Sequence, residues 1–324
     1  MPKARPRAGA EIVAIAAAGV AVRSAVAAVA AAAIRAVRVA DAKSEVVLES
    51  GRVGDDPARF LSPGIEAVMS HGELSIAELT EHLDRLLEAS SGKDYGPNGL
   101  QVQGRRPIRK VATGVSSCVE LFERARDTGA DAVLVHHGIF WDGTPRPLTG
   151  HTYARVATLI EAGMHLLAYH LPLDRHPELG NNILAVKRLG LYSVEPFADY
   201  HGLPIGFRGR YPEPISHEEL VERCRKVFGQ EPLAFLSGPE EVSTVGMVSG
   251  GAAGELHQAI SAGLDAYITG EPTEWVMNVA RENRIHFLAV GHYASERLGI
   301  QALGEHRAAR FGLAHEFIDV PNPV

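Results

Sequence analysis

The sequence predicts an α/β protein with mainly parallel strands, and three observations support this fold class. Short apolar runs alternate with helical patterns from about residue 75 to the C-terminus, which is typical of βαβ units. A Pro/Gly-rich passage at residues 201–214 separates the first alternation from a second one. The chain has 324 residues, of which 46% are hydrophobic and 22% charged, so it is long enough for one large or two ordinary domains.

The first set of elements begins with a helix that starts near Ile76. Ser75 precedes this helix and Glu78 follows three residues later, which predicts a capping box, and leucines continue at helical spacing. Residues 96–104 are rich in Gly, Pro and Asn and are interpreted as a loop. The patterns then predict strand 110–117, helix 119–128, strand 131–137, helix 152–162, strand 165–174 and helix 180–190.

The second set follows the Pro/Gly-rich passage and has the same alternating rhythm. It comprises helix 216–228, strands 232–237 and 243–250, helix 254–262, strand 265–271, helix 273–283 and strand 285–290. A helical pattern at 291–312 and a strand at 314–319 complete the chain. The glycine-rich stretch at 248–254 fits neither the Walker nor the dinucleotide pattern, so we interpret it as a tight turn.

Residues 1–70 differ in composition from the rest of the chain. Alanine occupies 13 of the 25 positions from Ile12 to Ala36, and Arg23 interrupts the apolar run before it could span a membrane. We expect an appended Ala-rich extension that is not part of the core, with Met69 close to the true start of the protein. A cleaved targeting peptide is the alternative.

Charge and cysteine content restrict the functional class. The net charge of −7 and the lack of a long basic run argue against nucleic-acid binding, and no segment predicts a membrane span. The two cysteines, Cys118 and Cys224, form no CxxC pair and no disulfide framework. We therefore expect a cytoplasmic protein.

Polar residues gather where the predicted strands end. His136 and His137 follow an apolar run, and His170 with Asp174, Glu271 and His292 follow three others. In open α/β sheets, ligands bind beyond the carboxyl ends of the strands. Each residue alone has an ordinary interpretation, such as a hydrogen-bonded structural histidine or an aspartate in a turn.

The combination of these residues indicates a metal centre. His292 and Glu296 are four residues apart, which places them on one face of a helix, although this spacing is also common for surface pairs. With His136, His137 and Asp174 they exceed the needs of one tetrahedral ion and suit two bridged divalent ions. Imidazole and carboxylate ligands without thiolate favour Zn, Fe, Mn, Co or Ni. Because adjacent side chains diverge, we expect His136 and His137 to bind different ions.

Five motifs in this order resemble those of the GTP cyclohydrolase I type 2 homologues, also called Nif-three-like dinuclear metal proteins. They are NGLQVQG (98–104), VHHGIFW (135–141), AYHLPLDRHPELGNN (168–182), DAYITGE (265–271) and GHYASERLG (291–299). The resemblance begins near Leu74 and implies metal ligands at His136, His137, Asp174, His292 and Glu296. Tyr293 stands where relatives usually have a second histidine, which puts a supporting or proton-transfer role at that position in doubt.

The resemblance also implies how the chain is organised. It implies a metal-binding α/β domain at 71–198 and 288–324, with a second α/β domain, 199–287, inserted in the middle of the chain. The dimetal site would lie between these domains, and the subunits would form a ring-like homohexamer.

The leading functional hypothesis is a dinuclear metal-dependent hydrolase whose metal-activated water attacks a nucleotide such as GTP at C8 of guanine, releasing formate. Glu271 is the candidate general base or substrate contact, and Asn98, Gln101 and His170 are candidates for supporting the ligands or binding substrate. Two alternatives remain open. One is a metal-dependent phosphoester hydrolase, and the other is a non-catalytic metal-binding hexameric scaffold or regulatory protein.

Overall fold

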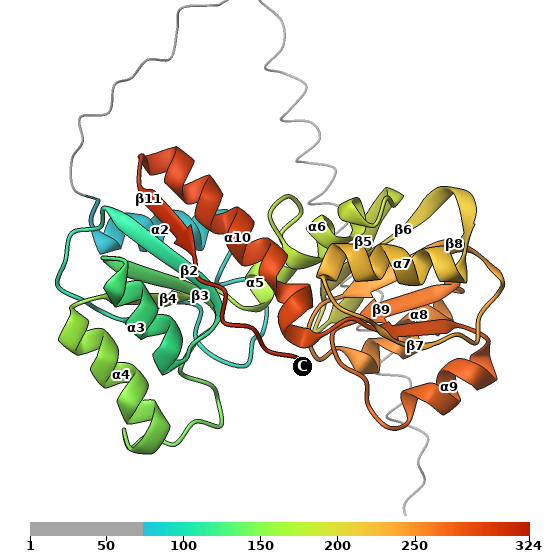
Figure 1. Ribbon diagram of the computed structural model, residues 1–324, viewed down its shortest axis with the longest axis horizontal. Coiled ribbons are helices and arrows are strands. Elements are labelled where there is room, and N and C mark those ends of the chain that lie inside the picture. Colours follow the sequence, from blue (N-terminus) through green and yellow to red (C-terminus); the bar gives the residue numbers. More distant parts are fainter. Residues whose placement is uncertain (1–73) are drawn as a thin grey trace, which may run out of the picture. The chain divides into compact units, whose positions relative to one another are not determined.

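A computed structural model describes residues 74–324, which belong to one compact unit. The Ala-rich extension expected at residues 1–70 and the expected start at Met69 lie outside these residues. The described chain forms two β-sheets flanked by helices (Figure 1). The prediction of mixed α/β architecture is therefore confirmed. In this part of the chain, no helix has the length and apolar character needed to cross a membrane.

The first sheet has five strands in the order β1-β4-β3-β2-β11. Its strands are β1 (Gly99–Val102), β2 (Lys110–Ser116), β3 (Ala132–His137), β4 (His165–Ala168) and β11 (Ala314–Phe317). All neighbours are parallel except β1, which pairs antiparallel with β4. The run predicted as a loop at 96–104 therefore contains an edge strand, which the prediction missed because glycine and proline at its start dominate the local pattern.

Two pairs of helices bury the two faces of this sheet. One face packs against α2 (Ile76–Leu86) and α10 (His292–Phe311), and the other against α3 (Val119–Asp127) and α4 (Gly150–Ala162). Neighbouring residues of β3 show the alternation, since Val133 belongs to the second core and Leu134 to the first. The capping box predicted at the start of α2 is present, with reciprocal hydrogen bonds between Ser75 and Glu78.

The second sheet has six strands in the order β5-β6-β8-β9-β10-β7. Its strands are β5 (Tyr192–Tyr200), β6 (Leu203–Ser216), β7 (Leu233–Phe235), β8 (Glu241–Val248), β9 (Ala266–Thr269) and β10 (His286–Ala289). Only β8, β9 and β10 pair in parallel, so this sheet contains more antiparallel pairing than we predicted. The predicted domain boundaries at 198/199 and 287/288 remain a prediction.

The Pro/Gly-rich passage at residues 201–214, which we expected to separate the two sets of elements, forms much of strand β6 in the antiparallel part of the second sheet. His201 and Gly202 form a two-residue turn between β5 and β6, with φ angles of +53° and +88°. Positive φ at both central residues is the geometry that a tight hairpin favours. Glycine adopts positive φ at no steric cost, whereas histidine seldom does, so the pair His201–Gly202 is a weak sequence signal for such a turn. The Pro/Gly-rich residues after this turn are therefore strand and not linker.

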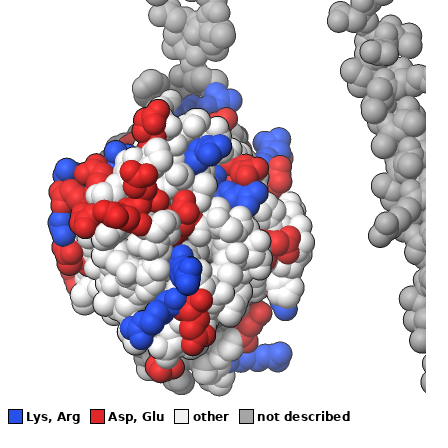
Figure 2. Space-filling view, turned by 90° about the vertical axis from the view of Figure 1, so that its right-hand side faces the viewer, with Lys and Arg blue, Asp and Glu red and all other residues white. Residues whose placement is uncertain are grey.

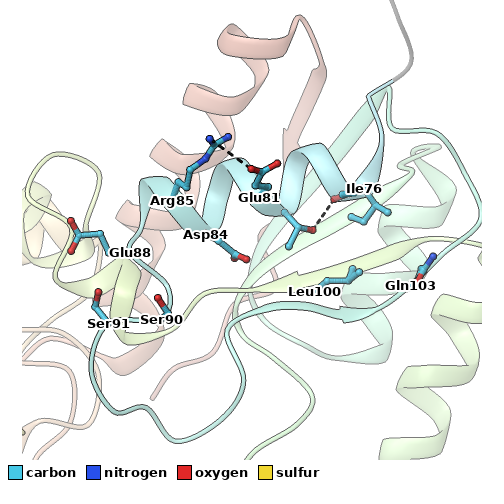
Figure 3. A pocket seen from close by; sticks show the side chains of 11 residues that line it. Ile76, Glu81, Asp84, Arg85, Glu88, Ser90, Ser91, Leu100 and Gln103 are labelled. Carbon is cyan, nitrogen blue, oxygen red and sulfur yellow. Dashed lines mark hydrogen bonds and ion pairs between the residues drawn. The ribbon is translucent and has the colours of Figure 1, made fainter.

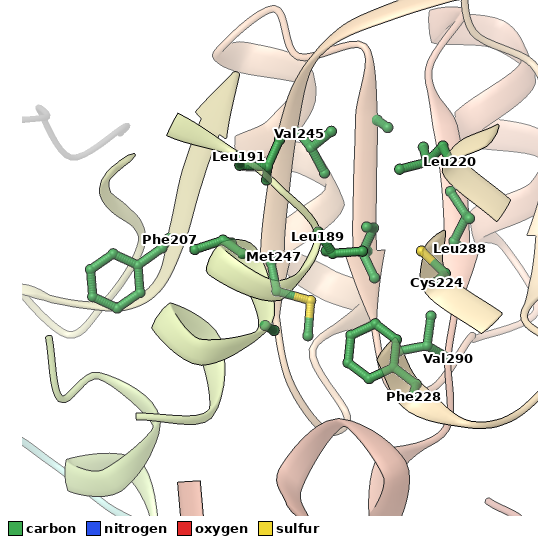
Figure 4. Packing of buried hydrophobic residues seen from close by; sticks show 14 of the residues in the cluster. Leu189, Leu191, Phe207, Leu220, Cys224, Phe228, Val245, Met247, Leu288 and Val290 are labelled. Atoms are coloured by element: carbon green, nitrogen blue, oxygen red, sulfur yellow. The ribbon is translucent and has the colours of Figure 1, made fainter. Parts of the chain in front are cut away.

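Helices also cover both faces of the second sheet. They are α6 (Asn181–Arg188) and α7 (His217–Phe228) on one face, and α8 (Leu256–Ser261) with α9 (Val276–Asn283) on the other. Figure 4 shows the first of these cores, in which Leu189, Leu220 and Phe228 surround Met247 of β8 and Leu288 of β10. Two short elements, α5 (Leu171–Asp174) and the 3-10 turn η1 (Ala253–Glu255), precede α6 and α8.

Helix α10 contributes to the cores of both sheets. Ala294 and Leu298 pack in the core of the second sheet, whereas Ile300 and Leu303 pack in that of the first. The N-terminal end of this helix thus lies where the two sets of elements meet (Figure 1).

The molecular surface on the side of the second sheet carries both acidic and basic side chains. Figure 2 shows the side at the right of Figure 1, where acidic and basic side chains are interspersed and broad areas are uncharged. Exposed apolar residues from these elements include Leu233 of β7, Leu236 after it and Met277 of α9.

Candidate metal centre

The side chains predicted as metal ligands come together at the ends of three elements. His136 and His137 are the last two residues of β3, Asp174 ends α5, and His292 and Glu296 lie in the first turns of α10. The rings of His136 and His137 have centroids 4.8 Å apart and an interplanar angle of 45°. Both can approach one site because the strand ends at His137.

Glu296 lies at the centre of the cluster. Its Oε1 atom is 3.5 Å from Nε2 of His136, which is itself 3.4 Å from Oδ2 of Asp174. Its Oε2 atom is 3.1 Å from Nε2 of His137 and 3.2 Å from Nε2 of His292. The ligand atoms thus form two groups of three that share Glu296, and each group is compact enough to hold one ion.

The outer nitrogen of each histidine has a fixed partner. Nδ1 of His136 donates to the carbonyl oxygen of Tyr169 (3.0 Å), and Nδ1 of His137 contacts Oγ of Ser116 (3.0 Å). Nδ1 of His292 contacts Oε1 of Glu271 at 2.6 Å. These contacts direct all three Nε2 atoms towards Glu296, which is how proteins orient metal-binding imidazoles.

The ligand atoms that converge at Glu296 are better suited to binding a metal ion than to forming hydrogen bonds with one another. Nε2 of His136 and Oε2 of Glu296 are buried and have no hydrogen-bond partner among residues 74–324. Buried polar atoms normally have hydrogen-bond partners, so two unpartnered atoms within one cluster of ligand-type side chains are what a cation-binding site provides. The residues present therefore fit divalent metal ions.

Asp174 is held by residues that the sequence analysis did not select. Its Oδ1 atom accepts hydrogen bonds from Nδ2 of Asn181 and Oγ of Ser249, both at 2.9 Å, which leaves Oδ2 towards His136. Asn181 also accepts a hydrogen bond from the backbone N–H of Gly299 in α10. Asn181 lies within the 168–182 motif, but single serine and asparagine residues give no periodic signal that identifies such a role.

The charges of the cluster shift its pKa values strongly. Burial lowers the pKa of His136, but the charges of Asp174 and Glu296 outweigh this and raise it to about 9. The pKa of His292 is likewise lowered by burial and raised to about 9 by Glu296 and Glu271. For Glu296, burial raises the pKa, whereas His137 and His136 lower it further, so the carboxylate stays ionised. Such coupled groups typify functional sites.

The other predicted site residues surround the cluster. His170 lies beside it, with ring centroids 5.0 Å from His136 and 5.5 Å from His137. Its Nδ1 contacts Oδ1 of Asp94 at 2.7 Å, and its backbone N–H donates to Oδ1 of Asn98. Asn98 also donates to Asp94 (2.8 Å). The sequence pattern does not single out Asp94, whose only signal is its position just before the first motif.

Gln101 and Glu271 act through their neighbours. Oε1 of Gln101 accepts a hydrogen bond from the backbone N–H of Ile139 (2.8 Å). This hydrogen bond holds the loop that follows β3 in place. Glu271 contacts the outer nitrogen of His292, on the side away from Glu296. This contact suits a positioning role for Glu271, and its role as a general base or substrate contact remains a prediction.

Tyr293 faces away from the cluster. Its hydroxyl donates to Oδ1 of Asp319 and accepts from the N–H of Val320, and its ring is packed in the core with α2. The replacement of a histidine at this position therefore leaves the ligand atoms of His292 and Glu296 untouched.

A cavity of about 580 Å³ opens onto the cluster. His137, Asp174, His292 and Glu296 lie at its base. Its remaining lining includes the aromatic residues Tyr95, Trp141 and Tyr200, the hydroxyls of Ser116 and Ser117, and the glycine-rich turn at 249–252. A pocket of this size, with aromatic walls and convergent polar groups, suits a small-molecule ligand.

A larger cavity of about 740 Å³ lies elsewhere, between α2 and β1 (Figure 3). No histidine lines it, and one of its acids, Glu81, pairs with Arg85 at 3.8 Å. It is an open surface groove without convergent ligand atoms, so the smaller cavity is the candidate site.

Comparisons with known proteins show that the described part of the chain is similar to one family along nearly all of its length. The family model for Duf34/NIF3 (NGG1p interacting factor 3) matches residues 74–323. A GTP cyclohydrolase 1 type 2 homolog from Pseudomonas aeruginosa is 42% identical over 251 residues, which cover 78% of this chain and 99% of that protein. A protein of the same description from Allochromatium vinosum is 41% identical over 249 residues, covering 77% of this chain and 97% of that one.

A solved structure of protein ybgI, described as of unknown function, superimposes with a TM-score of 0.74 at 38% sequence identity. The match covers 78% of this chain and 100% of that one. The predicted family resemblance is confirmed, and the chain belongs to the Duf34/NIF3 family.

Proposed function

We propose that this protein is a dinuclear metal-dependent hydrolase that acts on a nucleotide such as GTP. The observation that carries the proposal is the arrangement of two groups of three ligand atoms around Glu296 at the base of a 580 Å³ cavity. The relatives' description as GTP cyclohydrolase 1 type 2 homologs supports the choice of substrate to test first.

Each ion would have its own set of ligands. One would be held by His136, Asp174 and Glu296, and the other by His137, His292 and Glu296. Glu296 would bridge them, and the two adjacent histidines would serve different ions. The nitrogen and oxygen donors suit Zn, Fe, Mn, Co or Ni.

The remaining residues would prepare the reaction. Bound divalent ions supply an acidified water and polarise the bond under attack. Glu271, Ser116 and the carbonyl of Tyr169 hold the ligating rings in place. His170 lines the cavity with Nδ1 fixed by Asp94, so its Nε2 is available to accept or return a proton.

The aromatic wall would hold a flat ring. Tyr95 and Tyr200 lie against each other with ring centroids 5.7 Å apart, and Trp141 packs edge-on against His170 at 5.1 Å. Aromatic faces at such a cavity favour stacking of a planar heterocycle such as a purine base.

The test is formate release from GTP by the full-length protein after loading with each candidate metal. His137→Ala should lose most of the activity, whereas His306→Ala, which alters an exposed histidine of α10 outside the cavity, should retain it. Elemental analysis should give two ions per chain. Equal formate release from wild type and His137→Ala, or one ion per chain, would contradict the proposal.

We also propose that the subunits assemble as a homohexamer and work in the cytoplasm. Exposed apolar residues such as Tyr153 and Ile160 of α4 and Leu233 of β7 would be covered in the assembly. Both cysteines are free thiols, which fits a reducing compartment. Light scattering of the purified protein measures the assembly directly.

A further inference from the structure

We propose that Arg155 and Ser117 form an anion-binding subsite in the wall of the metal-site cavity, which receives the phosphate end of the substrate. Both residues line the cavity that contains His137 and Glu296. This inference extends the proposed function by naming the group that the cavity holds away from the reacting bond.

Arg155 is a cation without a partner. It lies in the second turn of α4 and is half-buried, and it makes no hydrogen bond or ion pair within residues 74–324. It is the only lysine or arginine among the residues that line the cavity. A guanidinium group presents several donors in a planar fork that matches phosphate oxygens.

The hydroxyl group of Ser117 is a second, independent observation that points to a ligand at this place. It is only 4% exposed, and its hydroxyl is a buried polar atom without a hydrogen-bond partner in the described chain. Its backbone N–H is already used, because it donates to the carbonyl oxygen of His137 at 2.9 Å. The hydroxyl is thus available to donate to a ligand oxygen.

The backbone around Ser117 adds positive potential. Ser117 directly precedes Cys118, the N-cap of α3, a helix of nine residues that packs beside α4. The first turn of a helix leaves amide groups without intrahelical acceptors, which favours an anion there. The acid in this turn, Glu120, pairs with Arg124 at 3.5 Å.

The carboxylates that line the cavity interact with residues other than Arg155. Asp174 and Glu296 belong to the metal cluster, and Glu255 accepts a hydrogen bond from Gln258. Arg155 therefore has no carboxylate as its own counter-ion, and an anionic ligand is the partner that its position allows.

The test is calorimetric titration of inorganic phosphate and pyrophosphate into the metal-loaded full-length protein. Arg155→Gln should weaken binding by about tenfold or more, and Ser117→Ala by a few fold, because each removes one donor to the anion. Arg155→Lys should retain most of the affinity. Arg188→Gln, which removes an exposed arginine of α6, is the matched control and should bind like wild type.

Equal dissociation constants for wild type and Arg155→Gln would overturn the subsite, as would an equal loss in Arg155→Gln and Arg188→Gln. Metal content measured in every variant shows whether the metal cluster has changed. The result is independent of turnover: Arg155-dependent phosphate binding without formate release would support the subsite and reject the proposed reaction.

Discussion

At the level of single residues, the cluster is organised by contacts behind the histidines. Glu271 contacts His292 on the nitrogen opposite to Glu296 at 2.6 Å, and Ser116 and Tyr169 do the same for His137 and His136. Such contacts fix both the tautomer and the direction of the ring. Metal affinity should therefore depend on residues that do not touch the ion.

Glu271→Gln tests this dependence. The amide keeps the shape of the side chain but removes the charge that favours the donating Nδ1–H of His292, so metal affinity should fall by about 10- to 100-fold. Competition with a metal chelator measures the affinity. Glu274→Gln, an exposed neighbour outside the cluster, is the control. Unchanged affinity in Glu271→Gln would mean that the contact with His292 has no influence on the ligand.

Glu296→Ala tests the shared ligand. Both groups of ligand atoms contain Glu296, so its loss should remove most of both ions and not just one. The subunit should remain folded by circular dichroism, because the neighbours Ala294 and Leu298 keep their packing. Retention of one full equivalent of metal would show that Glu296 serves a single ion.

The pKa of His292 predicts a pH dependence of the metal-free protein. Its folded value is raised to about 9, above the ordinary value of 6.5, so the folded state binds this proton more tightly than the unfolded state. The stabilisation is complete below pH 6.5 and is lost as the pH rises through 9.

Denaturant unfolding of the metal-free wild type and His292→Gln at pH 6.5 and pH 9 measures this effect. The free-energy advantage of wild type should shrink by on the order of 1–3 kcal/mol between the two pH values. An advantage that stays constant or grows with pH would contradict the raised pKa.

At the level of elements, α10 combines two roles on different faces. His292 and Glu296, four residues apart, face the cavity, while Tyr293 faces the segment after β11. The backbone N–H of Tyr293 also donates to the carbonyl oxygen of Val324 at 3.0 Å. Tyr293 therefore holds the C-terminal residues against the helix that carries the ligands.

Tyr293→Phe and Tyr293→His separate these roles. Neither should change the metal content, because the ligand atoms are on another face of α10. Tyr293→Phe should destabilise the protein by about 1 kcal/mol, since Asp319 and Val320 lose a partner. Amide exchange of residues 320–324 should become faster, and denaturant unfolding gives the free energy. A clear fall in bound metal would show that position 293 acts on the cluster.

At the level of the whole molecule, the described fold begins just before α2. Leu74 forms a bridge with Ile108, and Ser75 caps α2. The family match also begins at residue 74. All five candidate ligands lie between residues 136 and 296 of the described chain.

A chain that begins at Met69 should therefore keep the metal content and the assembly of the full-length protein. Elemental analysis and light scattering compare the two proteins. Insoluble protein, or a loss of metal from the shortened chain, would show that residues 1–68 are needed for the fold.

The sequence by itself determined the local features of this protein. The capping box at Ser75 and the helical periods depend on neighbours a few residues apart, so the pattern contains the information. The predicted strand 165–174 is too long, because β4 ends at Ala168 and Leu171–Asp174 forms α5. His136, His137, Asp174, His292 and Glu296 stood at predicted strand ends or one helical turn beyond them, and the sheet topology brings such ends together.

Only the tertiary structure decided which side chains support that cluster. Asp94 and Ser249 bind partners 76 and 75 residues away in the sequence, and Asn181 binds Gly299, 118 residues away. Glu271 contacts His292, 21 residues away. Short polar side chains in turns have no period, and their partners depend on how the two sheets pack around α10. For the same reason the free hydroxyl of Ser117 and the unpaired Arg155 became visible only in the folded cavity.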